Sequence, residues 1–148
     1  MIKIQKSAMV PYTAGQMYAL VADIESYPQF LPWCTEVKLV ARGEHDVTAR
    51  VALARSGIRQ SFTTRNRLHE GERIDMQLVD GPFRRLHGHW SFHPVGTERQ
   101  GCLVALHLEF EFSSKLLAMT FGKAFHSISS SLIDAFCARA RDLYGCPA

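Results

Sequence analysis

The sequence lacks the signatures of several protein classes. Its four cysteines, Cys34, Cys102, Cys137 and Cys146, show no paired spacing, so neither a zinc knuckle nor a disulfide framework is indicated. No apolar run is long enough to span a bilayer, and Met1 leads into a strand pattern instead of an apolar signal region. The sequence therefore predicts a cytoplasmic protein that is at most peripheral to a membrane.

Signatures of catalysis and of metal binding are also missing. There is no Gly-x-Ser-x-Gly elbow, no phosphate loop and no dinucleotide fingerprint. His87, His89 and His93 share one strand face, but no third metal ligand is apparent near any pair of them. The acids and histidines of the strand patterns fall mostly on the expected outer face, where a substrate inside the protein cannot reach them. We therefore predict no catalytic residue, no metal site and no required cofactor.

Length and charge indicate one soluble domain over residues 1–148. The net charge of +3 is too small to argue for nucleic acid, and no DNA partner is expected. Arginines nevertheless crowd the middle of the chain, where acids are fewer. A solvated sheet face explains them most simply, and a contact with anionic lipid or ribosomal RNA is the alternative. The arginines concerned are Arg50, Arg55, Arg59, Arg65, Arg67, Arg73, Arg84 and Arg85.

Seven segments alternate between apolar and polar residues, as half-buried strands do. They lie within residues 2–10, 36–41, 47–53, 58–68, 73–78, 86–93 and 102–112. After the first, Thr13 and Gln16 form a capping-box pattern for a short helix that ends near Ile24. Residues 27–34 follow, and Pro28 and Pro32 within them predict a short helical turn or a rigid elbow.

The last third of the chain, residues 113–144, predicts one long amphipathic helix. Ser113 or Ser114 can cap its start, and Gly145 followed by Pro147 marks its end. Such a helix is ~45 Å long, and it is the one element able to cover a one-sided sheet of seven strands, ~34 Å wide. The fold class is therefore α+β. The apolar stripe consists of Phe121, Phe125, Ile128, Leu132, Ala135, Phe136 and Leu143.

The order of elements resembles the helix-grip fold of the START and birch-pollen-allergen superfamily. In that fold a curved antiparallel sheet wraps around the C-terminal helix and encloses a cavity. Several motifs are similar to those of one family within it, the bacterial ribosome association toxin and coenzyme Q-binding protein family. They are Tyr27-Pro28 with Phe30-Leu31-Pro32-Trp33-Cys34, Phe62-Thr63-Thr64-Arg65-Asn66, Leu78-Val79-Asp80-Gly81-Pro82-Phe83, Glu109-Phe110-Glu111-Phe112 and Phe121-Gly122 with Phe125.

The resemblance implies a non-enzymatic protein that holds ubiquinone or a similar polyprenyl lipid in a hydrophobic cavity, in support of respiration, with peripheral contact to the inner membrane. One branch of the family is instead named for binding the large ribosomal subunit and blocking subunit joining. Members have also been labelled polyketide (oligoketide) cyclases by fold analogy, which is the weakest of the three alternatives. No residue of this sequence chooses between the branches.

The candidate ligand-binding residues combine the resemblance with the expected inner faces. Gln60, Thr64 and Asn66 are the polar members and could meet a quinone head group, although water or backbone partners are the simpler explanation. The full set is Tyr27, Phe30, Leu31, Trp33, Gln60, Phe62, Thr64, Asn66, Met76, Leu78, Trp90, Phe110, Phe112, Phe121, Phe125, Ile128 and Leu132.

For two further features of the long helix, the sequence alone does not say what surrounds the side chains. Arg139 falls near the centre of the apolar stripe, where an unpaired charge would be costly. We expect the helix to overshoot the sheet there, or the side chain to reach solvent; a charged contact near the closed end of the cavity is the alternative. A second apolar patch is expected on the outer side, where it would contact a loop, a bilayer or a partner. Its members are Leu116, Met119, Ile133 and Cys137.

Overall fold

Seven antiparallel strands form one sheet in the computed structural model, which describes residues 2–55 and 57–145. The spatial order is β1-β7-β6-β5-β4-β3-β2. The α+β fold and its seven strands are thus confirmed; Cys146 and Pro147 lie outside the described residues. The strands are β1 (Ile2–Val10), β2 (Cys34–Arg42), β3 (Asp46–Arg55), β4 (Ile58–His69), β5 (Arg73–Asp80), β6 (Phe83–Val95) and β7 (Gly101–Phe112).

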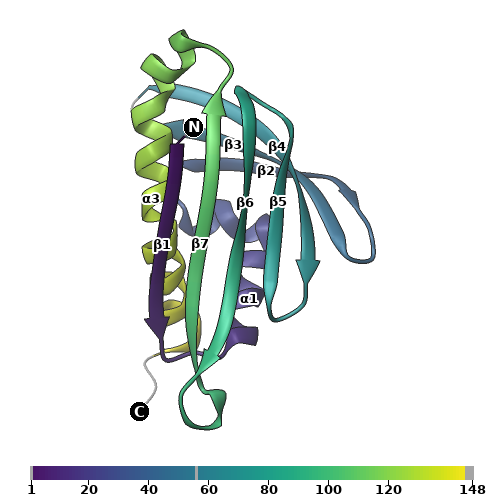
Figure 1. Cartoon of the computed structure of the whole chain (residues 1–148), viewed down its shortest axis with the longest axis vertical. Helices are drawn as coiled ribbons and strands as arrows, with labels where there is room; N and C mark the ends of the chain where they lie inside the picture. The colour runs from purple at the N-terminus through teal and green to yellow at the C-terminus, as the bar shows by residue number, and fades with distance from the viewer. Residues whose placement is uncertain (1, 56, 146–148) are drawn as a thin grey trace.

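The long C-terminal helix, α3 (Lys115–Tyr144), lies on one side of this sheet together with α1 (Ala14–Ala22) (Figure 1). Strands β1 and β7 run alongside α3, whereas β2 and β3 run across it, so the sheet curves around the helix (Figure 1). The other face of the sheet carries no helix in this view. The protein therefore has an inner face, which is covered, and an outer face, which is open.

Local signals of the sequence set the ends of the helices. Thr13 and Gln16 form the expected capping box, with the Gln16 amide N donating to Thr13 Oγ1 at 3.1 Å and the Thr13 amide N to Gln16 Oε1 at 2.9 Å. Ser114 caps α3, and Gly145, with φ of 75°, ends it. Between α1 and β2 the chain forms a 3₁₀ turn (Ile24–Ser26) and the short α2 (Tyr27–Phe30). Of the two conformations expected for residues 27–34, the structure thus has the short helical turn. Another 3₁₀ turn (Thr97–Arg99) joins β6 to β7.

Two large clusters of buried side chains lie between sheet and helix, and a smaller third cluster joins Ile24 to Val47 and Ala49. At the end where α3 begins, aromatic rings of Phe83, Phe110, Phe112, Phe121 and Phe125 pack with centroids 4.8–6.4 Å apart. The second cluster joins the inner faces of β5, β6 and β7 to α1 and the last turns of α3. The packing therefore becomes solid at both ends of the sheet, and space remains between the clusters.

The buried face of α3 is wider than the expected stripe, because Ala124, Ser129 and Ala140 are buried as well. Ile133, expected on the outer patch, is buried with Met17 and Leu20 of α1. Because α1 packs against α3 beside the sheet, the buried arc of the helix is wider than a single partner would make it. Leu143, expected in the stripe, is 52 % exposed.

Candidate ligand cavity and outer face

A cavity of about 100 Å³ lies between the sheet and α3, where the two side-chain clusters meet. Its wall is almost wholly apolar. Ten of the expected residues line it: Tyr27, Trp33, Phe62, Thr64, Asn66, Met76, Trp90, Phe125, Ile128 and Leu132. Two of the three polar candidates of β4, Thr64 and Asn66, thus lie on the cavity wall, and Gln60 does not.

The remaining candidates do not line the cavity. Phe110, Phe112 and Phe121 belong to the aromatic cluster that closes one end of it, and Leu31 is fully buried in the same cluster. Residues of the family motifs and expected inner-face residues occur both on the cavity wall and in the packed cluster beside it, so neither criterion distinguishes the two groups. All four side chains are part of the packed core beside the cavity.

Three other candidates lie at the margins of the fold. Phe30 packs on Phe136 and receives the guanidinium of Arg139, 5.0 Å from its ring centroid. Gln60 lies near the start of β4 and borders a groove on the outer face instead of the cavity. Leu78 packs beside the turn at Gly81, where β5 ends. None of the three is part of the cavity wall.

The wall also contains residues that the sequence did not single out. Most sit on the inner face of a strand, at positions that the alternation of the sequence already marks as apolar. Ser129 and Phe136 come from α3, and their place on the wall depends on how the helix is rotated. The additional residues are Val21, Ile24, Val51, Leu53, Ile74, Leu86, Leu106, Leu108, Ser129 and Phe136.

Few polar groups face this cavity, and most are engaged. Ser129 Oγ donates to the Phe125 carbonyl at 2.8 Å, and the Tyr27 hydroxyl donates to the Val21 carbonyl. Thr64 Oγ1 donates to Asn66 Oδ1 at 3.1 Å. Burial, with smaller contributions from Cys34 and Asp23, raises the pKa of Tyr27. The lining includes no aspartate, glutamate, histidine or lysine, and the phenol of Tyr27 is engaged by the Val21 carbonyl.

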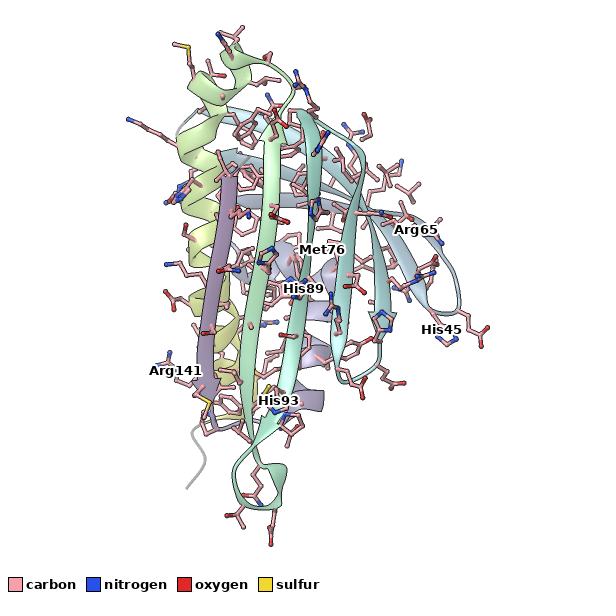
Figure 2. All side chains as sticks on the ribbon, in the orientation of Figure 1. His45, Arg65, Met76, His89, His93 and Arg141 are labelled. Carbon is pink, nitrogen blue, oxygen red and sulfur yellow. The ribbon has the colours of Figure 1, made fainter. Side chains whose placement is uncertain are left out.

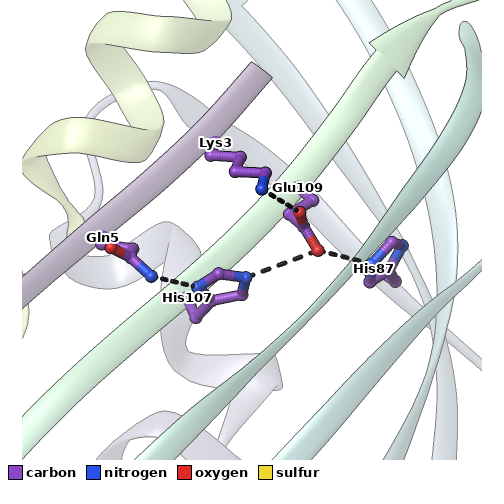
Figure 3. Close-up of polar contacts among 5 residues, drawn as sticks. All are labelled: Lys3, Gln5, His87, His107 and Glu109. Carbon is purple, nitrogen blue, oxygen red and sulfur yellow. Dashed lines mark hydrogen bonds and ion pairs between the residues drawn. The ribbon is translucent and has the colours of Figure 1, made fainter. Parts of the chain in front are cut away.

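A polar network on the outer face centres on Glu109 of β7 (Figure 3). His87 Nε2 lies 2.9 Å from Glu109 Oε2, His107 Nε2 lies 3.4 Å from the same oxygen, and Lys3 Nζ lies 3.5 Å from Oε1. The hydrogen bond from His87 is the main reason that the pKa of Glu109 is lowered. Gln5 Nε2 is 2.9 Å from His107 Nδ1, which leaves the His107 Nε2 proton for Glu109.

The histidines of this face form no metal site. Among residues 2–55 and 57–145, no group of three or more His, Cys, Asp or Glu side chains is arranged to hold a metal ion. His87 is bound to Glu109, and the His89 ring stacks on His107 with centroids 5.4 Å apart. Burial lowers the pKa of His89, and Arg73 and His107 lower it further.

Arginines border two open grooves on the same face. Lys38, Arg50 and Arg59 lie along a groove of about 670 Å³ over β2, β3 and β4. A second groove, of about 550 Å³, lies over β4 to β7. Figure 2 shows Arg65 and His89, which border it, on the side of the sheet away from the helices. The second groove contains Arg65, Arg67, Arg73, His87, His89 and His107 beside Asp75 and Glu109.

The first turns of α3 expose apolar side chains. Leu116 is 69 % exposed and Met119 is 81 % exposed, beside the exposed Lys115 and Lys123. Of the expected outer patch these two residues are the exposed members, because Ile133 is core and Cys137 is half-buried. No helix in the part of the chain described here has the length and apolarity to cross a membrane.

Comparison with known proteins identifies relatives over nearly the whole chain. Residues 10–137 match the family described as polyketide cyclase / dehydrase and lipid transport. The ribosome association toxin RatA of Escherichia coli is 44% identical over 144 residues, which are 97% of this chain and 90% of that protein. RatA of Pseudomonas aeruginosa is 40% identical over 96% of this chain and 97% of that protein. The mitochondrial coenzyme Q-binding protein COQ10 of Dictyostelium discoideum is 26% identical over 90% of this chain and 66% of that protein.

Solved structures share the fold. An 18 kDa protein from Caulobacter crescentus is 33% identical, with a TM-score of 0.76 over 99% of this chain and 100% of that one. An aromatase/cyclase from a Streptomyces species has a TM-score of 0.82 over 95% of this chain and 93% of that one, but at 14% identity it shows the fold alone. The helix-grip architecture, the family match and the relatives agree, and the chain belongs to the START-like polyketide cyclase / dehydrase and lipid transport family.

Proposed function

We propose that this protein associates with the ribosome through the large subunit and that it acts by binding, without catalysis. The observation that carries this proposal is the 44% identity, over 97% of the chain, to a relative named for ribosome association. The apolar cavity wall supports the non-catalytic part, because it presents no carboxylate or imidazole to a substrate.

The outer face is the surface that we assign to ribosomal RNA. Phosphate groups are bound chiefly by arginine and lysine side chains. Arg50 reaches the hydroxyl of Ser61 at 2.8 Å and no carboxylate, and Arg59 and Arg67 form no ion pair within the described chain. Their charges remain available to a partner, whereas Arg65 and Arg73 already contact Asp46 and Asp75.

Sucrose-gradient fractionation of a cell extract tests the proposal. We expect the protein in the large-subunit fraction at low salt and its release as salt rises. The double change Arg50→Glu and Arg59→Glu should abolish the association, whereas Lys123→Glu, on the exposed side of α3, should leave it intact. Protein that stays at the top of the gradient at every salt concentration would refute the ribosomal role, and equal loss with Lys123→Glu would refute the assigned surface.

The cavity favours a second function, the binding of a polyprenyl quinone such as ubiquinone. An apolar wall with a few polar groups is the usual form of a small-molecule site, and one relative is named for binding coenzyme Q. The volume of about 100 Å³ is below the roughly 300 Å³ at which ordinary ligand pockets begin, so a quinone requires the cavity to widen. Met76 and Leu132 are half-buried wall residues with the side-chain freedom to move.

The exposed start of α3 would give this second function access to lipid. Leu116 and Met119 can enter the interface of a bilayer, while Lys115 and Lys123 meet anionic head groups. Flotation with vesicles that contain anionic lipid measures this contact. We expect Leu116→Ser with Met119→Ser to remove it.

Solvent extraction of the purified protein followed by mass spectrometry tests the quinone. A copurified quinone or isoprenoid, together with a rise in melting temperature when ubiquinone is added, is the expected result. Absence of both effects would refute the second function and would leave the ribosomal one standing.

A further inference from the structure

Asn66 carries the one side-chain amide of the cavity wall, and its NH₂ group, like the indole N–H groups of Trp33 and Trp90, has no hydrogen-bond partner within the described chain. It is 8 % exposed, lies in the second half of β4, and lines the cavity together with residues of α3. Its Oδ1 accepts the hydrogen bond from Thr64, whereas its Nδ2 amide has no partner within the described chain. Every fully enclosed side-chain nitrogen or oxygen of that part of the chain has a partner, so Nδ2 must border open space.

The neighbouring polar groups explain why the amide stays free. Ser129 and Tyr27 direct their hydroxyl protons to carbonyls of their own helical segments, and Thr64 directs its proton to Asn66. The Thr64 bond holds the side-chain amide with its oxygen toward Thr64 and its NH₂ toward the cavity. Because Nδ2 borders open space and has no partner within the described chain, an acceptor that enters the cavity can bind it without displacing another protein group.

We propose that Asn66 is the head-group donor of the cavity, and that it selects apolar ligands carrying a carbonyl acceptor. Thr64 is the positioning residue. Its hydroxyl proton is donated to Asn66 Oδ1, so it orients the amide and has no proton left to donate to the ligand. The inference rests on the second proposed function and deepens it: the apolar wall would supply affinity for any isoprenoid, whereas Asn66 would distinguish a quinone from a hydrocarbon of the same length. A site built to donate a hydrogen bond rejects analogues that cannot accept one.

The two tryptophans provide the assay. They are the only ones in the chain, and both Trp33 and Trp90 line the cavity. Quenching of their fluorescence by decylubiquinone therefore reports occupancy. A matched ligand without acceptors, n-decylbenzene, is measured by its competition with decylubiquinone. The informative quantity is the ratio of the two dissociation constants within one variant, since loss of folded protein changes both alike.

Three variants separate the amide from the rest of the wall. Asn66→Leu should weaken decylubiquinone about 10- to 100-fold while decylbenzene binds as before or more tightly. Thr64→Val should weaken the quinone by a smaller factor in the same direction. Leu132→Ala, which removes apolar wall without touching the amide, should weaken both ligands alike. If Asn66→Leu does not melt cooperatively, Asn66→Ala removes the same donor with less added volume.

The measurements distinguish a failure of the Asn66 role from a failure of quinone binding itself. A ratio of dissociation constants that is unchanged in Asn66→Leu and in Asn66→Ala overturns the role of Asn66 while quinone binding itself stands. Water would then be the partner of the amide. If decylubiquinone neither quenches the wild-type protein nor raises its melting temperature, the inference and the quinone function both fail.

Discussion

Gly88 should be the least replaceable glycine of the sheet. It lies in the middle of β6, between Met76 of β5 and Leu108 of β7. A Cβ atom at this position would lie 2.2 Å from the carbonyl oxygen of His107 and 3.0 Å from the Cα of Leu108. Both neighbours are backbone atoms of a paired strand, so neither can turn aside as a side chain could. Gly88→Ala must therefore push β6 and β7 apart beside the cavity.

The expected cost is at the upper end of the range for overpacked interiors, about 3 kcal/mol. For a chain of this size each kcal/mol lowers the melting temperature by about 2–4 °C, so the fall should be roughly 6–12 °C. Differential scanning calorimetry measures it. Urea denaturation followed by circular dichroism provides an independent free energy of unfolding.

Gly15 provides the matched control. It lies in α1, where the nearest atom to an added Cβ is Thr13 Oγ1 at 3.9 Å, an ordinary contact. Alanine is preferred to glycine within helices, so Gly15→Ala should stabilise the protein by up to about 1 kcal/mol. If Gly88→Ala melts within 2 °C of the wild type (about 1 kcal/mol or less), or if both variants shift in the same direction, the steric argument is wrong.

Three more predictions concern the core, the outer face and the thiols. Phe136→Ala removes a buried ring in contact with Tyr27, Phe30 and Trp90. It should lower the free energy of unfolding measured by urea denaturation by about 3–5 kcal/mol, and a loss of less than half of that would contradict the burial of Phe136 in the core. Glu109 has a lowered pKa, so its stabilisation is present above the unfolded value, about 4.3, and is lost as pH falls through the folded value. Glu109→Gln should therefore reduce the fall in melting temperature on acidification below about pH 5, and an unchanged profile would count against the His87 contact. Burial raises the pKa of Cys34 to about 11, so iodoacetamide at pH 8 (about three units lower) should modify Cys34 only after unfolding; peptide mapping by mass spectrometry that finds equal labelling in the native protein would refute its burial.

Local sequence patterns were sufficient to predict many of the strands and helix ends. Alternation along β7, from Cys102 to Phe112, and along the second half of β4, from Phe62 to Leu68, identified the inner face of each strand because a strand with one covered face repeats every two residues. Thr13 and Gly145 marked helix ends through interactions within a few residues of the chain. Such signals depend on neighbours in sequence, so they can be found without a fold.

The candidate site was less predictable from the sequence. Thr64 and Asn66 stand out as polar residues on an apolar face, and they do border the cavity. Phe110 and Phe121 carry the same apolar signal but belong to the packed aromatic cluster. The sequence pattern of a buried apolar residue is the same whether its side chain packs against another ring or borders a cavity. The distinction depends on how volumes from distant elements add up.

The sequence by itself determined that this chain has seven strands, a long covering helix and an outer face rich in arginine, since each follows from periodicity or composition. Tertiary structure alone decided that α1 buries Ile133, that the cavity is about 100 Å³, and that the Asn66 amide faces it with Nδ2 unpaired. The physical reason is range: periodicity records which side of an element is covered, whereas cavity shape and hydrogen-bond partners depend on contacts between residues far apart in the chain.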